Sequence, residues 1–198
     1  MPEAILAYIR VIDAMNRVIG RIAMYLIFAL IGVLLWSSVS KTFFDPALWT
    51  LETAQFVMVA YYVLGGPYSI QLGANVRMDL FYGGWTPRTK AGVDAVTVLF
   101  LMFYLGVLFH GAVNSTAYSL GYFGREPYGF FADLFVTFVT EGPQAASAKL
   151  GYMERSRTVW QPYLWPVKTV LILGVVLMLM QALAEFFRDL ARLKGEET

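Results

Sequence analysis

Four long apolar stretches, separated by more polar segments, dominate the pattern of this chain of 198 residues. The stretches cover residues 22–40, 53–76, 95–113 and 164–187. Each is close to the roughly 20 residues that a helix needs to cross the ~30 Å hydrocarbon core of a bilayer. Lys168 lies near the start of the last stretch, where its long side chain can reach the interface. The pattern predicts an all-α integral membrane protein with four transmembrane helices in a single membrane domain, residues 1–198.

Residues 1–21 have a different periodicity, which predicts an amphipathic helix. Isoleucine recurs at helical spacing, and Asp13 and Arg17 stand four residues apart on another face. We expect this helix to lie flat on the membrane surface before the first span. The alternative is a signal peptide, since residues 38–40 supply small side chains after an apolar run, but cleavage there would remove an unusually long leader.

Two further apolar segments are too short to span a bilayer. Residues 78–85 are expected to form an interfacial element, followed by a helix with Thr86 as N-cap and Pro87 at its first position. Residues 130–139 carry Asp133 and cover about half a span, which favours an interfacial or protein-packed helix. The alternative is a fifth crossing, which would move the basic C-terminus to the other side of the membrane.

Basic residues are concentrated at one side of the predicted spans. They precede the first span, lie between the second and third, and follow the fourth: Arg10, Arg17, Arg21, Arg77, Arg88, Lys90, Arg188, Arg192 and Lys194. The loop of residues 114–163 instead balances its basic residues with acidic ones. By the positive-inside rule, we expect both termini in the cytoplasm and the 114–163 loop in the periplasm.

Composition excludes several classes of function. Hydrophobic residues make up 58% of the chain and charged residues 15%, which agrees with lipid as the main solvent. A net charge of +1 without a long basic run argues against a nucleic acid partner. The chain has no cysteine and one histidine, His110, so a thiolate metal site and a pair of haem ligands are excluded. No metalloprotease, serine-hydrolase or phosphate-loop motif is present. We therefore expect no enzyme, and no catalytic, cofactor-binding or metal-binding residue.

The centres of the predicted spans contain no Asp, Glu, Lys or Arg. A transporter that works alone usually has ionisable residues at membrane depth or broken helices in paired halves, and Pro67 is an interruption without a counterpart. We therefore do not expect this chain alone to move a coupled substrate. The alternative is a small stand-alone transporter or channel that homo-oligomerises around a pore.

Several motifs together resemble those of a known family. In chain order they are Trp49-x-x-Glu52, Gly73-x-Asn75-Val76-Arg77-Met78-Asp79 and Pro87-Arg88. Their order and spacing, together with the segment 156–168 before the last span, are similar to the small membrane subunit of tripartite ATP-independent periplasmic (TRAP) transporters, the DctQ-like family. One departure is Asn75, because the family often has histidine at this position.

The resemblance implies a non-catalytic subunit that scaffolds a large multi-span permease subunit in the bacterial inner membrane. The large subunit would hold the substrate and sodium sites. A periplasmic substrate-binding protein would deliver the substrate, commonly an organic acid. The implied function is binding-protein-dependent uptake of an organic acid by sodium symport.

Six residues are candidates for subunit contacts or structural roles: Trp49, Glu52, Arg77, Asp79, Trp160 and Lys168. Glu52 and Arg77 flank the second span, about 38 Å apart at 1.5 Å per residue, so they cannot pair with each other. We expect Glu52 to pair with Lys41 or Lys168 at the outer end. We expect Arg77 and Asp79 to anchor the following turn or to contact the large subunit. The alternative for these charges is an ordinary topology-setting position in the headgroup layer.

Overall fold

The structure, a computed structural model, describes residues 2–73 and 84–194 of the chain. These residues form six helices: α1 (Glu3–Phe43), α2 (Thr50–Gln71), α4 (Pro87–Ser119), α5 (Pro127–Thr140), α6 (Pro143–Ala148) and α7 (Trp165–Lys194). The described residues form no β-sheet, and one isolated antiparallel bridge joins Arg155 to Tyr163. The all-α class predicted from the sequence is confirmed.

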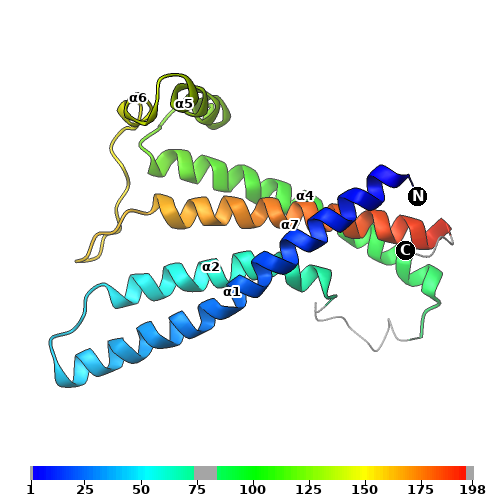
Figure 1. The fold of residues 1–198 in the computed structure, drawn as a ribbon, viewed down its shortest axis with the longest axis horizontal. Coiled ribbons are helices and arrows are strands. Elements are labelled where there is room, and N and C mark those ends of the chain that lie inside the picture. The colour runs from blue at the N-terminus through cyan, green and yellow to red at the C-terminus, as the bar shows by residue number, and fades with distance from the viewer. Residues whose placement is uncertain (1, 74–83, 195–198) are drawn as a thin grey trace.

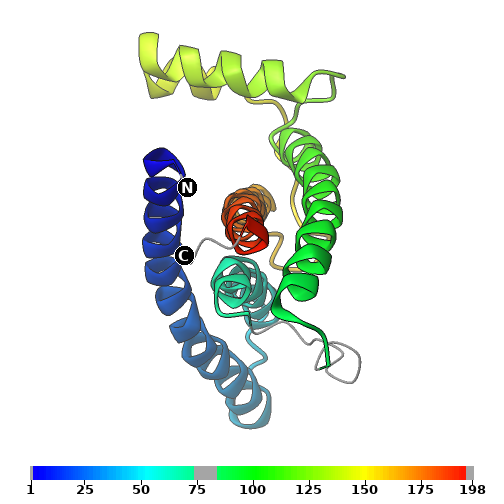
Figure 2. The ribbon, with the colours of Figure 1, turned by 90° about the vertical axis from the view of Figure 1, so that its right-hand side faces the viewer.

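The four long helices pack into a bundle (Figure 1). α1 and α2 form an antiparallel hairpin, α4 and α7 form a second antiparallel pair, and α2 packs against α7. The N-terminal part of α1 also crosses α7. Both termini lie at one end of the bundle, which we call the inner end (Figure 1). α5 and α6 lie at the opposite end, the outer end, next to α4, and Figure 2 shows that α5 runs crosswise on one side of the bundle.

Glycine residues allow the long helices to approach one another closely. A side chain at Gly20 of α1 would overlap Tyr68 of α2. A side chain at Gly174 of α7 would overlap both the side chain and the backbone of Val63 of α2. In lipid, where the hydrophobic effect does not drive helices together, such small residues let backbones meet and gain van der Waals contact. The helix pairs α1–α2 and α2–α7 are therefore in close contact at these levels.

Within the described residues, three helices are long and apolar enough to cross a membrane: α1, the Thr89–Ser119 part of α4, and α7. α2 is not among them, although its 22 residues extend ~33 Å at 1.5 Å per residue. Its hydropathy is lowered by Gln55 and by three tyrosines. Three of the four predicted spans thus fall in helices that meet these criteria, and the crossing by α2 stays a prediction.

α1 joins two predicted elements into one helix. The sequence predicts a surface helix over residues 1–21 and a separate span over 22–40, but the helix runs without a break from Glu3 to Phe43. The physical reason is one stripe of buried residues that crosses the expected boundary at helical spacing: Ile9, Ile12, Asn16, Gly20 and Ala23. The expected separation is corrected, whereas a flat position of residues 1–21 on the membrane stays a prediction.

One local prediction, the N-cap of α4, is confirmed by the described residues, whereas an interfacial position for segment 130–139 stays a prediction. Thr86 accepts a hydrogen bond from the backbone N–H of Thr89 at 3.3 Å, and α4 begins at Pro87. The short apolar segment 130–139 lies in α5, whose 14 residues extend ~21 Å and are too few to cross a bilayer. In the predicted interfacial segment 78–85, residues 78–83 lie outside the described residues.

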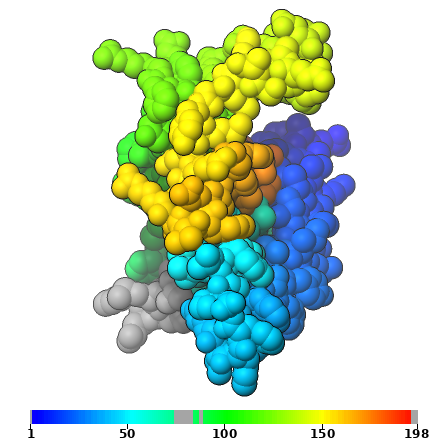
Figure 3. All heavy atoms as spheres, turned by 90° about the vertical axis from the view of Figure 1, so that its left-hand side faces the viewer, coloured from blue at the N-terminus to red at the C-terminus, as the bar shows by residue number. Residues whose placement is uncertain are grey.

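The connection from α6 to α7 folds back over the start of α7 at the outer end (Figure 3). Its backbone bonds to the end of α4, since Gly151 N–H donates to Leu120 O and Glu154 N–H donates to Ser119 O, both at 3.0 Å. Gly121 has a φ of +85°, and a side chain there would overlap the backbone of Gly151. This crossing of two chain segments fixes Glu154 beside the ends of α4 and α7.

Candidate functional site

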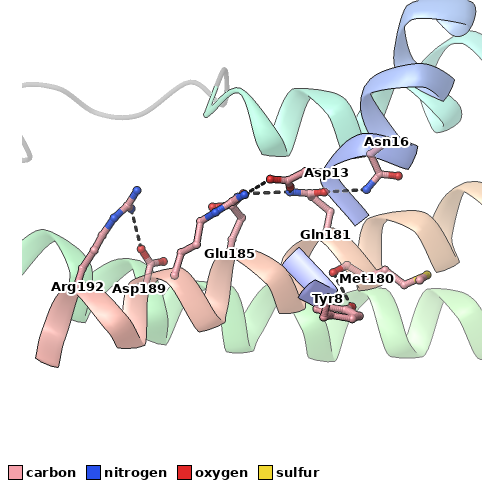
Figure 4. Close-up of polar contacts among 9 residues, drawn as sticks. Tyr8, Asp13, Asn16, Met180, Gln181, Glu185, Asp189 and Arg192 are labelled. Carbon is pink, nitrogen blue, oxygen red and sulfur yellow. Dashed lines mark hydrogen bonds and ion pairs between the residues drawn. The ribbon is translucent and has the colours of Figure 1, made fainter. Parts of the chain in front are cut away.

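A buried polar cluster joins α1 to α7 near the inner end of the bundle (Figure 4). Gln181 is 0% exposed and Asn16 is 1% exposed. Asn16 Nδ2 donates to Gln181 Oε1 at 2.7 Å. Gln181 Nε2 donates to Asp13 Oδ1 and to Glu185 Oε1, both at 3.1 Å. These bonds satisfy both ends of the Gln181 amide, which would otherwise be costly to bury.

Arg188 supplies the positive charge of the cluster. Its guanidinium forms ion pairs with Asp13 on α1 and with Glu185 three residues earlier on α7. The side chains of Arg188, Asp13 and Glu185 are only 17%, 16% and 19% exposed. Loss of one partner from such a pair leaves a buried charge without compensation. We call Asp13, Asn16, Gln181, Glu185 and Arg188 the inner polar cluster.

Two flanking contacts extend the cluster along α7 (Figure 4). On one side, the Tyr8 hydroxyl donates to the backbone carbonyl of Met180 at 3.0 Å. On the other side, Arg192 pairs with Asp189 at 3.1 Å, and Asp189 is 4% exposed. Tyr8 adds a second direct contact between the N-terminal part of α1 and α7.

At the outer end, Lys168 connects three parts of the chain. Its Nζ lies 2.5 Å from Glu154 Oε2 and donates to the Ser115 carbonyl at 3.1 Å. The predicted pairing of Lys168 with Glu52 is therefore wrong. The reason is that backbone hydrogen bonds place Glu154 beside the start of α7, where its carboxylate forms the ion pair with Lys168.

Glu52 lies at the outer end of α2 and is only 4% exposed. Its Oε2 is buried and has no hydrogen-bond partner within the part of the chain that the structure describes. Lys41 is exposed and forms no ion pair with it, so the second predicted partner is not brought to Glu52 either. Nearby, the Thr50 hydroxyl donates to Ala47 O at 2.8 Å, and its Oγ1 lies 3.1 Å from Ser37 Oγ, which joins the end of α1 to the start of α2.

The other predicted candidates are placed as follows. Trp49 is the N-cap residue of α2 and is 39% exposed. Trp160 lies in the connection before α7 and is 44% exposed. Arg77 and Asp79 lie outside the described residues. Among the four candidates that the structure describes, none is brought together with another in one site.

His110 links α4 to α5. Its Nδ1 lies 2.9 Å from the Tyr128 hydroxyl, and its Nε2 lies 3.0 Å from Asn114 Nδ2. An amide nitrogen only donates, so Nε2 accepts from Asn114 and Nδ1 carries the proton that it donates to Tyr128. Among the described residues, no group of three or more His, Cys, Asp or Glu side chains could hold a metal ion.

Sequence reasoning missed the inner polar cluster. One available signal was Glu185, a charged residue inside the apolar stretch 164–187, because an ionisable residue in a span usually faces protein and has a partner. A second signal was Asn16, which lies in register with the buried isoleucines of the same helix. No local sequence pattern indicated that Asp13 pairs with Arg188, because the two residues are separated by 175 positions.

The described residues form a helical protein with membrane-length apolar helices, exposed apolar side chains and polar contacts at both ends. A family model described as "Tripartite ATP-independent periplasmic transporters, DctQ component" matches residues 30–128, which are 99 of the 198 residues. The chain therefore belongs to the DctQ family, the small permease component of TRAP transporters. Comparisons with curated proteins and with solved structures find no match.

Membership of this family has three direct consequences. The chain is a component of a transporter, and the family is not an enzyme family. The family implies association with a large TRAP permease subunit and with a binding protein. Together with the apolar helices, it makes this chain a membrane-embedded protein. The matched region contains Trp49 and Glu52, whereas the whole inner polar cluster lies outside it.

Proposed function

We propose that this chain is a rigid scaffold for the large permease subunit, in a system for sodium-coupled, binding-protein-dependent uptake of an organic acid. The observation that carries the scaffold role is the close-packed middle of the bundle. Between the two ends, α4 and α7 meet through the buried apolar residues Leu105, Val175 and Ala182, and Gly174 brings α7 against α2. A substrate path needs polar groups or a cavity at this depth, whereas a scaffold needs tight helix contacts.

The proposed topology has four crossings, with α2 as the one whose hydropathy is lowest. α2 runs antiparallel to α1 and packs against both α1 and α7, although both of these helices extend past it at the inner end (Figure 1). The inner end carries both termini and most of the basic residues of α1 and α7. From the positive-inside rule we propose that the inner end faces the cytoplasm and that α5 and α6 lie in the periplasm, and from the family we propose the bacterial inner membrane.

Single cysteines test this topology, because the chain has none of its own. We expect Ser147→Cys, in α6, to react with an impermeant thiol reagent in spheroplasts, and Arg10→Cys, near the N-terminus, to be protected until the membrane is opened. Reaction of both positions in intact spheroplasts contradicts an N-terminus in the cytoplasm.

We propose an exposed apolar face of α4 as a surface for the large subunit. The face consists of Phe100, of Phe103 and Tyr104 three and four residues later, and of Val107, and these side chains are 72%, 75%, 60% and 60% exposed. Large aromatic side chains at helical spacing are suited to fill grooves of a neighbouring membrane helix. Trp49 and Trp160, both partly exposed at the outer end, are proposed to lie at the headgroup level beside the same partner.

Reconstitution decides between the scaffold and the stand-alone alternative. We expect proteoliposomes with this chain alone to show no saturable uptake of an organic acid under a sodium or proton gradient. Addition of the cognate large subunit and of the binding protein should produce sodium-dependent uptake. Saturable uptake by this chain alone, above that of empty vesicles, would refute the scaffold role and favour a small homo-oligomeric transporter.

A further inference from the structure

A polar cavity of about 460 Å³ lies at the inner end between α1, α2 and α7. Four arginines line it: Arg17, Arg21, Arg188 and Arg192. The acidic residues in the lining are Asp13 and Glu185, so the wall carries four positive and two negative charges, a net +2. The two acids already pair with Arg188. The cavity wall therefore has an excess of positive charge, which favours the binding of an anion.

The excess positive charge belongs to Arg17 and Arg21. Arg192 has a partner in Asp189, whereas the structure gives neither Arg17 nor Arg21 an ion pair or hydrogen bond to any described residue. The two stand four residues apart on α1, so both side chains lie on the face that borders the cavity. Two guanidinium groups on one wall are suited to the oxygens of a phosphate group, which accepts several charge-assisted hydrogen bonds.

The cavity lies where the apolar part of the bundle ends. Arg21 is the last charged residue before the uncharged run 22–40 of α1. The opposite wall includes Tyr68 and Leu72 at the end of α2, which continue the apolar surface of that helix. A ligand bound here would have its charged part among the arginines and its apolar part along α1 and α2. This arrangement fits a phospholipid better than a free anion.

Gln71 favours a lipid headgroup that carries a hydrogen-bond donor. It lines the same cavity, and its side-chain oxygen Oε1 is buried without a hydrogen-bond partner among the described residues. A buried acceptor without a donor costs free energy, so a donor on the ligand would be favourable. Glycerol hydroxyls of a headgroup are such donors.

We propose that this cavity binds the headgroup of an anionic phospholipid of the phosphatidylglycerol type. Arg17 and Arg21 contact the phosphate, and Gln71 accepts a hydrogen bond from a headgroup hydroxyl. Basic pockets between transmembrane helices on the cytoplasmic side are suited to anionic lipids in general. The site would hold one lipid against the α1–α2 hairpin and would not take part in movement of the substrate.

Native mass spectrometry of the full chain in detergent measures this binding directly. We expect the wild-type chain to retain one phosphatidylglycerol and to bind phosphatidylcholine about tenfold more weakly, because phosphatidylcholine has no net charge. The double variant Arg17→Gln/Arg21→Gln should lose this preference. The matched control is Arg10→Gln/Lys194→Gln, which removes two exposed charges from the same end but none from the cavity.

A second comparison isolates the role of Gln71. The variant Gln71→Leu should weaken the binding of phosphatidylglycerol and leave that of phosphatidic acid, which lacks the headgroup alcohol, unchanged. Equal loss in the double variant and in its control overturns the proposal, as does equal binding of phosphatidylcholine and phosphatidylglycerol by the wild type. Inorganic phosphate that competes at millimolar concentration would assign the site to a free anion and overturn the lipid assignment.

Discussion

The two ends of the bundle hold their helices together by different means. At the inner end, side chains of α1 and α7 bond directly, and the ion pairs of Arg188 are less than one fifth exposed. At the outer end, a connecting segment lies between the helices and carries the polar contacts. There, Lys168 and Glu154 are 20% and 31% exposed, and Lys149 and Asp133 are 40% and 61% exposed.

This difference shows why ion pairs of similar length contribute differently to stability. Water screens an exposed pair and can solvate either partner after the other is removed, so the pair contributes little. A buried pair has lost that solvation, so removal of one partner leaves the other charge in an unfavourable environment. We therefore expect the effect of mutation to fall from the inner end to the outer end.

The largest expected effect is at Arg188. Arg188→Met should lower the free energy of unfolding by about 3–5 kcal/mol, because Asp13 and Glu185 are left buried without a counter-charge. Unfolding by a denaturing detergent in mixed micelles measures the loss. Arg10→Met, an exposed arginine on α1, is the matched control and should change stability by no more than about 0.5 kcal/mol.

Equal losses for Arg188→Met and Arg10→Met would show that the inner pairs are as weak as exposed ones. A triple variant adds a further check. With Asp13→Asn and Glu185→Gln added to Arg188→Met, both uncompensated charges are removed, and part of the lost stability should return.

An intermediate effect is expected in the middle of the bundle, which separates the two ends. Gly174→Ala would place a methyl group against the side chain and backbone of Val63 and should cost about 1–3 kcal/mol. Gly106→Ala on α4 is the control, since a methyl group there meets no atom within 4 Å and alanine favours a helix. The same unfolding measurement applies, and a Gly174 variant as stable as the Gly106 variant contradicts close α2–α7 packing.

The smallest effect is expected at the outer end. Lys168→Met should cost about 1 kcal/mol, since its pair with Glu154 is partly exposed and it also bonds to the Ser115 carbonyl. Lys149→Met, which breaks a more exposed pair, should cost about 0–0.5 kcal/mol. If the Lys168 variant is as unstable as the Arg188 variant, solvent exposure does not explain the difference between the ends.

The helices could be predicted from the sequence because their signals are local. Runs of apolar residues located α1, α2, α4 and α7, and the pair Thr86 and Pro87 located the start of α4. The continuity of α1 was not predicted, because Asp13 and Arg17 gave its first half the pattern of a surface helix. In the structure, the face with Asp13 is turned to protein, where Arg188 compensates its charge.

The partners of the polar residues could not be predicted, because they depend on how distant segments meet. Glu52 was expected to pair with Lys41 or Lys168 because all three residues were placed at the outer end. Instead, the segment between α6 and α7 bonds to the end of α4, and this places Glu154 next to Lys168. Likewise, the bond between Asn16 and Gln181 follows from the crossing of α1 over α7, which no short motif records.

The ion pair between Asp13 and Arg188 also constrains the order of events during synthesis. The two residues are separated by 175 positions, so at 5–20 residues per second the ribosome makes the partner of Asp13 about 9–35 s after Asp13 itself. Throughout that interval, the nascent N-terminal helix carries Asp13 and Asn16 without α7 to receive them. Docking of the N-terminal part of α1 onto α7 is therefore a late step of biogenesis, and a chain that stops before the last helix leaves these polar groups without their partners on α7.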